Sequence, residues 1–440
     1  MSVRFAATLL LIAWSIHGWD PDLSVAAAQV LPPSITVGKN VLVSRGEAFP
    51  HVEPHLAANP RDPNRLVAAA MTFPEPGRGS RVRVYVSRDG GKRWTSQVLD
   101  TVSPAPQDDP QVAFAPDGTA YLSYLPGRIW RSHDGGLTWQ GPASLPTEGG
   151  SLDYPVVAVD SGGAVYIAAS QVNRGGATGR FIFSVSVFRS TDQAVSFEGP
   201  VRIQPNNFNN QSGDILIRPD GAVLVTLHEN GVGSESLTSP RLWTQWSSDK
   251  GQTFSVPHLV TEGFASRGPA LAMDRSGGET KGRIYAVWAG MVGDGDNRLS
   301  FSDNGGATWS KPVRVTTGAK DRYPTRMQIA VNPRGIVGLS WKEQRPEVGT
   351  DCFQLYFTAS LDHGRTFLEP VPVAPVASCG SAPGNAIPFN AGDRTVGRRW
   401  RSGGDYDGLV AMPDGNFRAL WTDSRTGSFQ IWTAPITVRP

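Results

Sequence analysis

Residues 131–139 read RSHDGGLTW, and variants of this stretch recur five more times along the 440-residue chain. Each copy has a Ser, then an Asp, then usually Gly, and ends on an aromatic residue. The six copies are VSRDGGKRW (86–94), RSHDGGLTW (131–139), RSTDQAVSF (189–197), SSDKGQTF (247–254), FSDNGGATW (301–309) and SLDHGRTF (360–367). Apolar, strand-like runs precede the copies and a second short run follows each. We therefore predict six β-hairpins that share one type of turn.

The residue types suit such a turn. The Asp carboxylate can accept hydrogen bonds from the turn's own N–H groups, and Gly adopts a positive φ without a Cβ clash. The aromatic ring can cover the hairpin from one side. We expect a structural role for these aspartates: Asp89, Asp134, Asp192, Asp249, Asp303 and Asp362. The third copy has Gln193 and Ala194 in place of Gly, so we expect its turn to be distorted or weaker.

A second repeat sets the fold class. Seven segments consist of an apolar run, a turn rich in Pro, Asp and Gly, and another apolar run: 54–70, 110–124, 155–170, 213–227, 269–288, 327–341 and 408–421. With the hairpins above, each unit has four strands, and such units pack side by side as the blades of a β-propeller. About 59 residues per blade favours seven blades over six, which would need about 69. The last blade lacks an outer strand, which we expect the segment near 41–44 to supply.

Composition supports an all-β protein and excludes other classes. The chain has 49 Gly and 35 Pro, only 18% charged residues and a net charge of +2. These values exclude a coiled coil, a helical bundle and a basic nucleic-acid binder. We expect no nucleic-acid partner and no cofactor.

The N-terminus resembles a secretory signal peptide. Arg4 precedes an apolar run of about 12 residues, and a small-residue site, Ala26–Ala28, follows before Gln29. We predict a signal at 1–28, a single propeller domain at 29–440, no membrane span after removal of the signal, and a secreted or periplasmic monomer. An uncleaved anchor is the alternative. In an oxidising compartment, Cys352 and Cys379 would form a disulfide, with a catalytic thiol as the alternative.

The Ser-x-Asp-x-Gly-x-Thr-Trp turn resembles the Asp box, or bacterial neuraminidase repeat, of the sialidase-like propeller superfamily. The resemblance implies an Asp acid/base, a Tyr nucleophile with a Glu partner, and Arg side chains that bind a substrate carboxylate. Matching the order of these residues gives Asp109, Glu229 and Tyr406 as catalytic candidates. The substrate-binding candidates are Arg267, Arg322, Arg326, Trp341 and Arg401, on the same predicted face. The substrate would be a glycan, cleaved by an exo-sialidase type of reaction.

Other interpretations stay open. Asp boxes also occur in xyloglucan-cleaving enzymes, sorting receptors and assembly factors, so a non-catalytic binding propeller is the main alternative. A polysaccharide lyase with His228 as base is another. The acids and arginines of WKEQR (341–345) and WTDSR (421–425) suit salt bridges, and Trp341 suits core packing. We expect no metal site, although His51, Glu53 and His55, or the loops GDGDNR (293–298) and GDYDG (404–408), are weak candidates for one.

Overall fold

The computed structural model describes residues 32–174, 181–203, 209–230, 240–263, 269–289, 296–317, 327–390, 392 and 394–440. The predicted signal at 1–28 lies outside these residues. The chain divides into two units, Met1–Pro32 and Pro33–Pro440. No helix within the described ranges is both long enough and apolar enough to cross a membrane.

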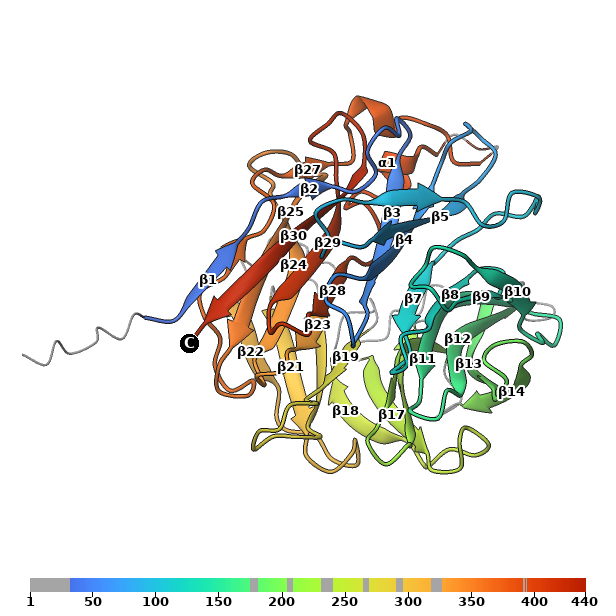
Figure 1. The fold of residues 1–440 in the computed structure, drawn as a ribbon, viewed down its shortest axis with the longest axis vertical. Helices are drawn as coiled ribbons and strands as arrows, with labels where there is room; N and C mark the ends of the chain where they lie inside the picture. Colours follow the sequence, from blue (N-terminus) through green and yellow to red (C-terminus); the bar gives the residue numbers. More distant parts are fainter. Residues whose placement is uncertain are drawn as a thin grey trace, which may run out of the picture. The chain divides into compact units, whose positions relative to one another are not determined.

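The unit Pro33–Pro440 is a β-propeller of seven blades, as predicted (Figure 1). Blade 1 consists of β3 (His51–Ala58), β4 (Leu66–Thr72), β5 (Arg81–Ser87) and β6 (Thr95–Gln97). Blade 2 consists of β7 (Gln111–Phe114), β8 (Ala120–Tyr124), β9 (Arg128–Ser132) and β10 (Gln140–Ser144). Blade 3 consists of β11 (Ser151–Val159), β12 (Val165–Arg174), β13 (Phe181–Ser190) and β14 (Glu198–Ile203). Blade 4 consists of β15 (Asn209–Ile217), β16 (Val223–Asn230), β17 (Arg241–Ser247) and β18 (His258–Glu262). Blade 5 consists of β19 (Ala270–Met273), β20 (Ile284–Ala289), β21 (Asp296–Ser302) and β22 (Val313–Thr317). Blade 6 is β23 (Gln328–Val331), β24 (Val337–Gln344), β25 (Cys352–Ser360) and β26 (Val371–Pro372), with β27 (Ser378–Cys379) also paired to β25. Blade 7 is β28 (Gly408–Ala411), β29 (Phe417–Asp423), β30 (Gln430–Arg439) and the N-terminal β1 (Ser34–Val37), with β2 (Val41–Leu42) also paired to β30.

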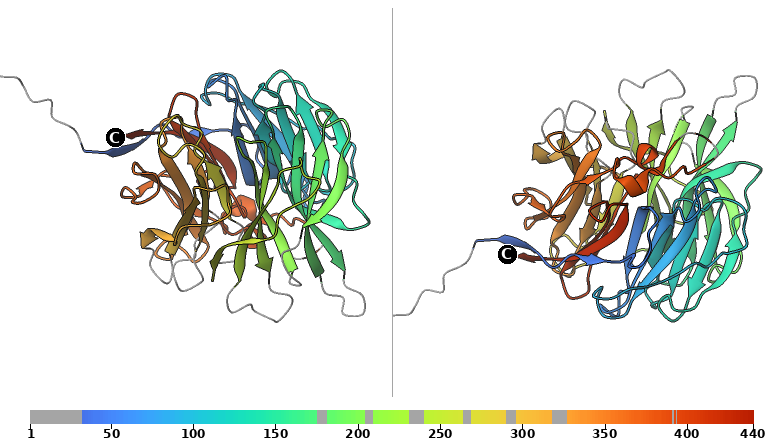
Figure 2. Two further views of the ribbon diagram at one scale, coloured as in Figure 1. Left: turned by 90° about the horizontal axis from the view of Figure 1, so that it is seen from below. Right: turned by 90° about the horizontal axis from the view of Figure 1, so that it is seen from above.

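The inner strands β3, β7, β11, β15, β19, β23 and β28 each contact the next, and β28 contacts β3, so the ring is closed. Two N-terminal strands complete the last blade, because both β1 and β2 pair antiparallel with β30. The first and last blades therefore lie side by side (Figure 2). Joining the two ends of the chain in one sheet leaves no open edge at the point where the ring closes.

Each interface between neighbouring blades has its own apolar cluster. Between blades 1 and 2, for example, Val67, Val84 and Leu122 are fully buried together, and between blades 6 and 7 Phe357 packs against Phe417. Equivalent clusters occupy the other five interfaces. This arrangement follows from the repeat, because a four-stranded sheet has two apolar faces and can bury them only between two other blades.

The six predicted turns share one hydrogen-bond pattern, which the second copy illustrates. Ser132 Oγ donates to Asp134 Oδ1 at 2.8 Å, and the backbone N–H groups of Leu137 and Thr138 donate to the same oxygen at 3.0 and 2.9 Å. Thr138 Oγ1 donates to Asp134 Oδ2, and the Trp139 indole donates to Gly136 O. Burial alone would raise the pKa of Asp134, but the hydrogen bonds from Thr138, Ser132 and Leu137 outweigh burial and lower the pKa to about 2.

The fifth turn corrects one assignment. Its acceptor is Asn304 and not Asp303: Ser302 Oγ donates to Asn304 Oδ1 at 2.9 Å, and Thr308 N donates to the same atom. Asp303 instead forms an ion pair with Arg283, at 2.7 Å. In every copy, the Oγ of the Ser accepts one backbone N–H of the turn, and the residue two positions after that Ser accepts the other hydrogen bonds. In the fifth copy this residue is an Asn.

The third turn corrects another expectation, because it is not distorted. Asp192 Oδ1 accepts hydrogen bonds from Ser190 Oγ, Val195 N and Ser196 N, as in the other copies. The absence of Gly appears instead as backbone strain, since Gln193 and Ala194 take φ values of 59° and 63°.

Candidate active site

Three neighbouring blades carry a strained residue at the same point of their inner strands. Glu53, Asp109 and Tyr154 each precede a proline and have φ values of 54°, 51° and 51°. In blades 1 and 3 the pairing of the inner strand also shifts register here. A positive φ is uncommon for residues other than Gly, and such strain gathers at functional sites. These three residues therefore mark the candidate site.

Asp109 belongs to a group of four carboxyl side chains. Its carboxyl is within hydrogen-bonding reach of Glu53 in blade 1 and of Asp153 in blade 3. Asp108 accepts a hydrogen bond from Ser80 Oγ and lies close enough to Asp153 to feel its charge. Glu53 is only 3% exposed, whereas Asp109 is half-buried. Asp109 is thus the less buried residue of the two, although its carboxyl group is itself desolvated.

Burial and like charge raise the pKa of Glu53 and of Asp109. For Glu53 the largest cause is desolvation by burial, followed by the charge of Asp405, and its pKa rises to about 8. For Asp109 burial again comes first, followed by the charges of Glu53 and Asp153, and its pKa lies well above the usual value. Since two carboxyls that share a buried site do not ionise together readily, the Glu53–Asp109 pair keeps a proton at neutral pH.

The segment 373–407, between blades 6 and 7, completes the surroundings of Glu53. It contains β27, a 3₁₀ turn at Pro383–Asn385 and the short helix α1 (Val396–Arg399). Trp400 Nε1 donates to Glu53 Oε1 at 2.8 Å, and the Glu53 N–H donates to Gly403 O at 3.1 Å. A Cβ on Gly404 would lie 2.6 Å from Glu53 Cγ, so this close approach requires Gly.

Aromatic side chains lie against the carboxyl group. Tyr406 Oη donates to the carbonyl of Pro110, the residue after Asp109, at 3.3 Å. The Tyr406 ring makes edge contacts with Tyr154, at 5.4 Å between centroids, and with His55, at 6.3 Å. His55 Nδ1 accepts a hydrogen bond from Val112 N. The structure therefore brings Asp109 and Tyr406 together from opposite ends of the chain.

Glu229, the third catalytic candidate, is bound within its own blade. The Arg241 guanidinium donates to its carboxylate at 2.8 and 2.9 Å, and the Arg241 N–H donates to it at 3.1 Å. The Arg241 guanidinium also lies over the Trp243 ring, 5.2 Å from its centroid. His228, the candidate base of the lyase alternative, is adjacent in β16 and 2% exposed.

The substrate-binding candidates separate into three groups. Arg267, Arg322 and Arg326 lie outside the described residues. Trp341 is 3% exposed and packs in the core between blades 5 and 6, stacked on Tyr356. It therefore packs in the core, which is the alternative given above, and its stacking on a sugar stays a prediction. Arg401 is exposed and donates to Thr350 O at 2.8 Å.

The alternative metal clusters are occupied by protein partners. His51 Nε2 is 2.6 Å from Glu47 Oε2, so His51 and His55 bind different groups. Asp407 in GDYDG pairs with Lys342 at 2.9 Å, and Asp296 in GDGDNR pairs with Arg314 at 2.8 Å, while Asp294 lies outside the described residues. Within the described ranges, no three or more His, Cys, Asp or Glu side chains are grouped so as to hold a metal ion.

The predicted hairpin salt bridges occur in altered form. Arg425 pairs with Asp423 of WTDSR, and Trp421 Nε1 also donates to Asp423, at 3.1 Å. In WKEQR, Arg345 pairs with Glu347 beyond the motif. These acids and arginines stabilise loops of blades 6 and 7.

Comparisons with known proteins fit this architecture. No protein-family model matches the chain. A xyloglucanase from a Paenibacillus species is 25% identical over 292 residues, which cover 62% of this chain and 27% of that protein. The chain thus matches about a quarter of the length of this curated relative. Among solved structures, a Dyadobacter fermentans protein of unknown function superposes with a TM-score of 0.51 at 14% identity, over 92% of this chain and 99% of the other. A Hadza microbial sialidase is similar at a TM-score of 0.48 and 15% identity, over 83% and 75% of the two chains.

Four-stranded blades in a closed ring, with the same Ser-x-Asp or Ser-x-Asn turn in six of them, decide the fold. In fold, the chain is a sialidase-like propeller. The comparisons support the fold alone. Any reaction of this sialidase-like propeller has to be inferred from its own side chains.

Sequence reasoning missed two parts of the propeller's site. Neither Glu53 nor Trp400 was among the catalytic or substrate-binding residues predicted from the sequence. The signal for Glu53 is the repeat itself: it occupies the position before Pro that Asp109 and Tyr154 occupy in the next two blades. No comparable signal marks Trp400, because its partner lies 347 residues away.

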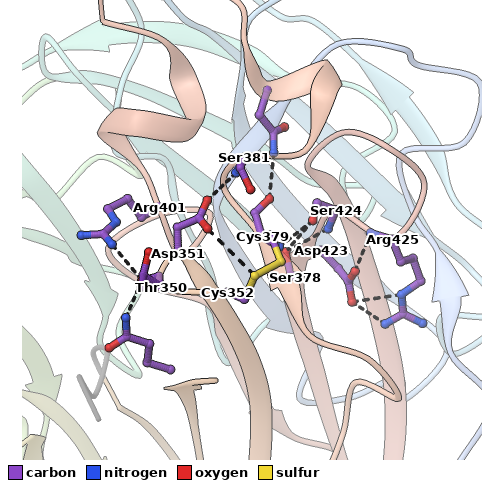
Figure 3. The surroundings of a disulfide bond; sticks show 12 residues. Thr350, Asp351, Cys352, Ser378, Cys379, Ser381, Arg401, Asp423, Ser424 and Arg425 are labelled. Atoms are coloured by element: carbon purple, nitrogen blue, oxygen red, sulfur yellow. Dashed lines mark hydrogen bonds and ion pairs between the residues drawn. A yellow bond between two sulfur atoms is a disulfide. The ribbon is translucent and has the colours of Figure 1, made fainter. Parts of the chain in front are cut away.

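A disulfide fixes the base of the segment that carries Trp400. Cys352 in β25 is bonded to Cys379 in β27 (Figure 3). Next to it, Asp351 accepts hydrogen bonds from Ser381 N and Gly380 N, and Arg401 donates to Thr350 O (Figure 3). The far end of the segment packs on blade 1, where Trp400 lies against Phe73 with ring centroids 5.1 Å apart.

Proposed function

We propose that the protein hydrolyses glycosidic bonds, with Asp109 as the proton donor. The observation that carries the proposal is the Asp109 carboxyl itself: its residue is half-buried, it lies beside Glu53 and Asp153, and burial raises its pKa well above the usual value. A general acid must hold its proton at the working pH, and burial beside other carboxylates is how a glycosidase achieves this. The named activity of the Paenibacillus relative, a xyloglucanase, adds support for a glycan substrate.

The proposed reaction uses two steps. Asp109 transfers its proton to the glycosidic oxygen as the bond from this oxygen to the anomeric carbon breaks. In the exo-sialidase type, the buried Tyr406 hydroxyl turns from the Pro110 carbonyl toward the sugar, its oxygen forms a bond to that carbon, and its phenolic proton passes to a neighbouring carboxylate. Water then attacks the same carbon as its bond to the Tyr406 oxygen breaks; Asp109, now ionised, accepts the water's proton, and the neighbouring carboxyl returns the phenolic proton to Tyr406. In a glycanase without a covalent intermediate, water attacks directly, a second carboxylate beside Asp109 accepts the water's proton, and Tyr406 only supports the site.

The sialidase-type version keeps Arg267, Arg322 and Arg326 as candidates to bind a substrate carboxylate. Glu229 takes a different part in it. Because Arg241 binds the Glu229 carboxylate through its side chain and its backbone, we propose that Glu229 holds Arg241 in place. The role of activating Tyr406 then passes to the Glu53–Asp109 pair.

We also propose that the protein is exported and loses residues 1–28. The layout of these residues supports the proposal, as does the Cys352–Cys379 disulfide, because such bonds persist mainly in oxidising compartments. N-terminal sequencing of protein recovered from outside the cytoplasm should start near Gln29. An intact Met1 would contradict export with cleavage.

The decisive experiment compares two substrates and three variants. The purified protein would be assayed on 4-methylumbelliferyl N-acetylneuraminate and, by reducing-end release, on xyloglucan. We expect turnover of at least one, reduced by roughly 10²–10⁴-fold in Asp109→Asn. Asp89→Asn, in a structural turn, is the matched carboxyl control and should keep full activity.

The outcomes separate the alternatives. Loss of sialoside turnover in Tyr406→Phe would support the exo-sialidase type, whereas xyloglucan turnover that survives Tyr406→Phe would support a glycanase. Absence of turnover on both substrates by a folded protein, or full activity of Asp109→Asn, would overturn the proposal. Glycan binding without turnover would then favour the non-catalytic propeller.

A further inference from the structure

A cavity of about 360 Å³ lies on the other side of α1 from the carboxyl group. Gly397 and Arg398 of α1 face this cavity, together with Arg401, whereas the next residue, Arg399, lies over the Trp400 ring and acts on the charge of Asp108. One helical turn, about 10 Å across with its side chains, therefore separates the cavity from the proposed catalytic group. We name this space the arginine cavity.

The walls of the arginine cavity are held together by covalent and hydrogen bonds. The Cys352–Cys379 disulfide joins β25 to β27 at its edge, and Ser381 N donates to the Asp351 carboxylate (Figure 3). Two glycines allow the walls to meet, because a Cβ on Gly397 would lie 1.9 Å from Gly380 O. A preformed cavity binds a ligand without first ordering its own walls.

The lining has an excess of positive charge. The lining contains two guanidinium groups, Arg398 and Arg401, and one carboxylate, Asp351. That carboxylate already accepts the Ser381 N–H. One N–H of the Arg401 guanidinium donates to Thr350 O. Within the part of the chain that the structure describes, Arg398 has neither an ion pair nor a hydrogen bond. Guanidinium donors are therefore available to a ligand anion, and their planar fork suits a carboxylate.

The rest of the lining suits a sugar ring. Ser381, Thr395 and Asn385 contribute hydroxyl and amide groups, and Ala382 and Ala386 contribute small apolar surfaces. The volume is at the lower end of the range for small-molecule sites, roughly 300–1,000 Å³, and thus fits one or two sugar units.

We propose that the arginine cavity is a binding subsite for a carboxylate-bearing sugar unit, such as a uronic acid. Arg398 and Arg401 bind the carboxylate, and the polar lining binds ring hydroxyls. The choice of a sugar rests on the proposed function, while the recognition of a carboxylate rests on the cavity alone. The subsite would select acidic glycans and hold them one helical turn from Asp109.

Binding is tested without turnover, by isothermal titration of the purified protein at low ionic strength with sodium D-glucuronate, D-glucose and sodium acetate. We expect glucuronate to bind more tightly than either control, and to bind about tenfold or more weakly to Arg398→Ala and to Arg401→Ala. Arg439→Ala removes the same charge at the exposed end of β30 and should bind like the wild type. Added salt should weaken binding, since the interaction is ionic.

Three results would overturn the inference: glucuronate binding no tighter than that of glucose or acetate, unchanged binding in both arginine variants, or an equal loss in Arg439→Ala. Asp109→Asn separates the two proposals, because it should abolish turnover and leave glucuronate binding intact. Loss of binding in Asp109→Asn would place the carboxylate at the catalytic group instead and would also overturn the subsite.

Discussion

The indole of Trp400 donates a hydrogen bond to the carboxyl of Glu53 at 2.8 Å, although 347 residues separate the two in the sequence. The bond joins the segment before blade 7 to the inner strand of blade 1, and it is buried at both ends. Trp400 is itself held by ring contacts with Phe73 and Phe389, at 5.1 and 5.2 Å. The position of the Glu53 carboxyl, and through it that of Asp109, thus depends on how the segment 373–407 packs.

Trp400→Phe should destabilise the protein by about 1–3 kcal/mol, because it keeps most of the ring packing but leaves the buried Glu53 Oε1 with only the longer hydrogen bond from Asp405 N, at 3.3 Å. Urea unfolding at pH 7 would measure the change. Trp432→Phe is the matched control, since the Trp432 N–H has no hydrogen-bond partner in the described structure. A loss in the control as large as in Trp400→Phe would show that ring volume, and not the hydrogen bond, matters.

The raised pKa values predict the alkaline limb of the pH–rate profile. In the proposed mechanism the protonated form of the Glu53–Asp109 pair is the active one, and the pKa of Glu53 is about 8, so kcat/KM should fall as pH rises above about 8. Glu53→Gln removes the charge that raises the pKa of Asp109, and should move this limb to lower pH. Profiles from pH 5 to 10 would check both statements. A limb that stays in place in Glu53→Gln would show that the pair does not control the proton donor.

The same carboxyls should make stability fall as pH rises. The pKa of Glu53 is about 4.3 in an unfolded chain and about 8 in the folded protein, so the folded state holds an extra proton between these values. Its favourable contribution is complete below about pH 4 and is lost as pH rises through about 8. Glu53→Gln removes this dependence, so its unfolding free energy relative to wild type should increase from pH 5 to pH 9. Urea unfolding at both pH values would measure this, and an equal difference at both would contradict the raised pKa.

The fold was predictable because the same short motifs recur along the chain, whereas the site is made of single residues from distant parts of the chain. Each blade repeats an inner hairpin, and six of the seven add a Ser-x-Asp or Ser-x-Asn turn, which sequence alone reveals. The error at Asp303 arose because two adjacent polar residues both suit the turn, and only the spacing from Ser302 selects Asn304. Among the described residues, the contact of Glu53 with Trp400 has no counterpart in other blades, so no repeat could indicate it. A Trp at the end of a strand, such as Trp341, suits the core and a sugar site equally well in sequence, and in the structure Trp341 packs in the core.

The strain in the third turn predicts a stabilising substitution. Gln193 is exposed and adopts a φ of 59°, a conformation that costs a residue with a Cβ about 1 kcal/mol. Gln193→Gly should therefore raise the unfolding free energy by roughly 0.5–1 kcal/mol, after the greater flexibility of Gly in the unfolded chain is offset. Gln193→Ala keeps the Cβ and should leave stability unchanged. Thermal unfolding of the two variants would decide, and an equal shift in both would show that the Gln side chain is responsible.

The disulfide predicts a coupling between stability and the arginine cavity. Cys352 and Cys379 are 27 residues apart, and in the chain-entropy model a cross-link of this span contributes on the order of 3 kcal/mol. The double variant Cys352→Ser/Cys379→Ser should lose about that much in urea unfolding. Its effect on the two sites should differ, because Cys379 adjoins the cavity wall at Gly380, while Trp400 is held separately on Phe73. We expect glucuronate binding to weaken more than tenfold and turnover to fall less, and a larger fall in turnover than in binding would show that the disulfide positions the carboxyl group instead.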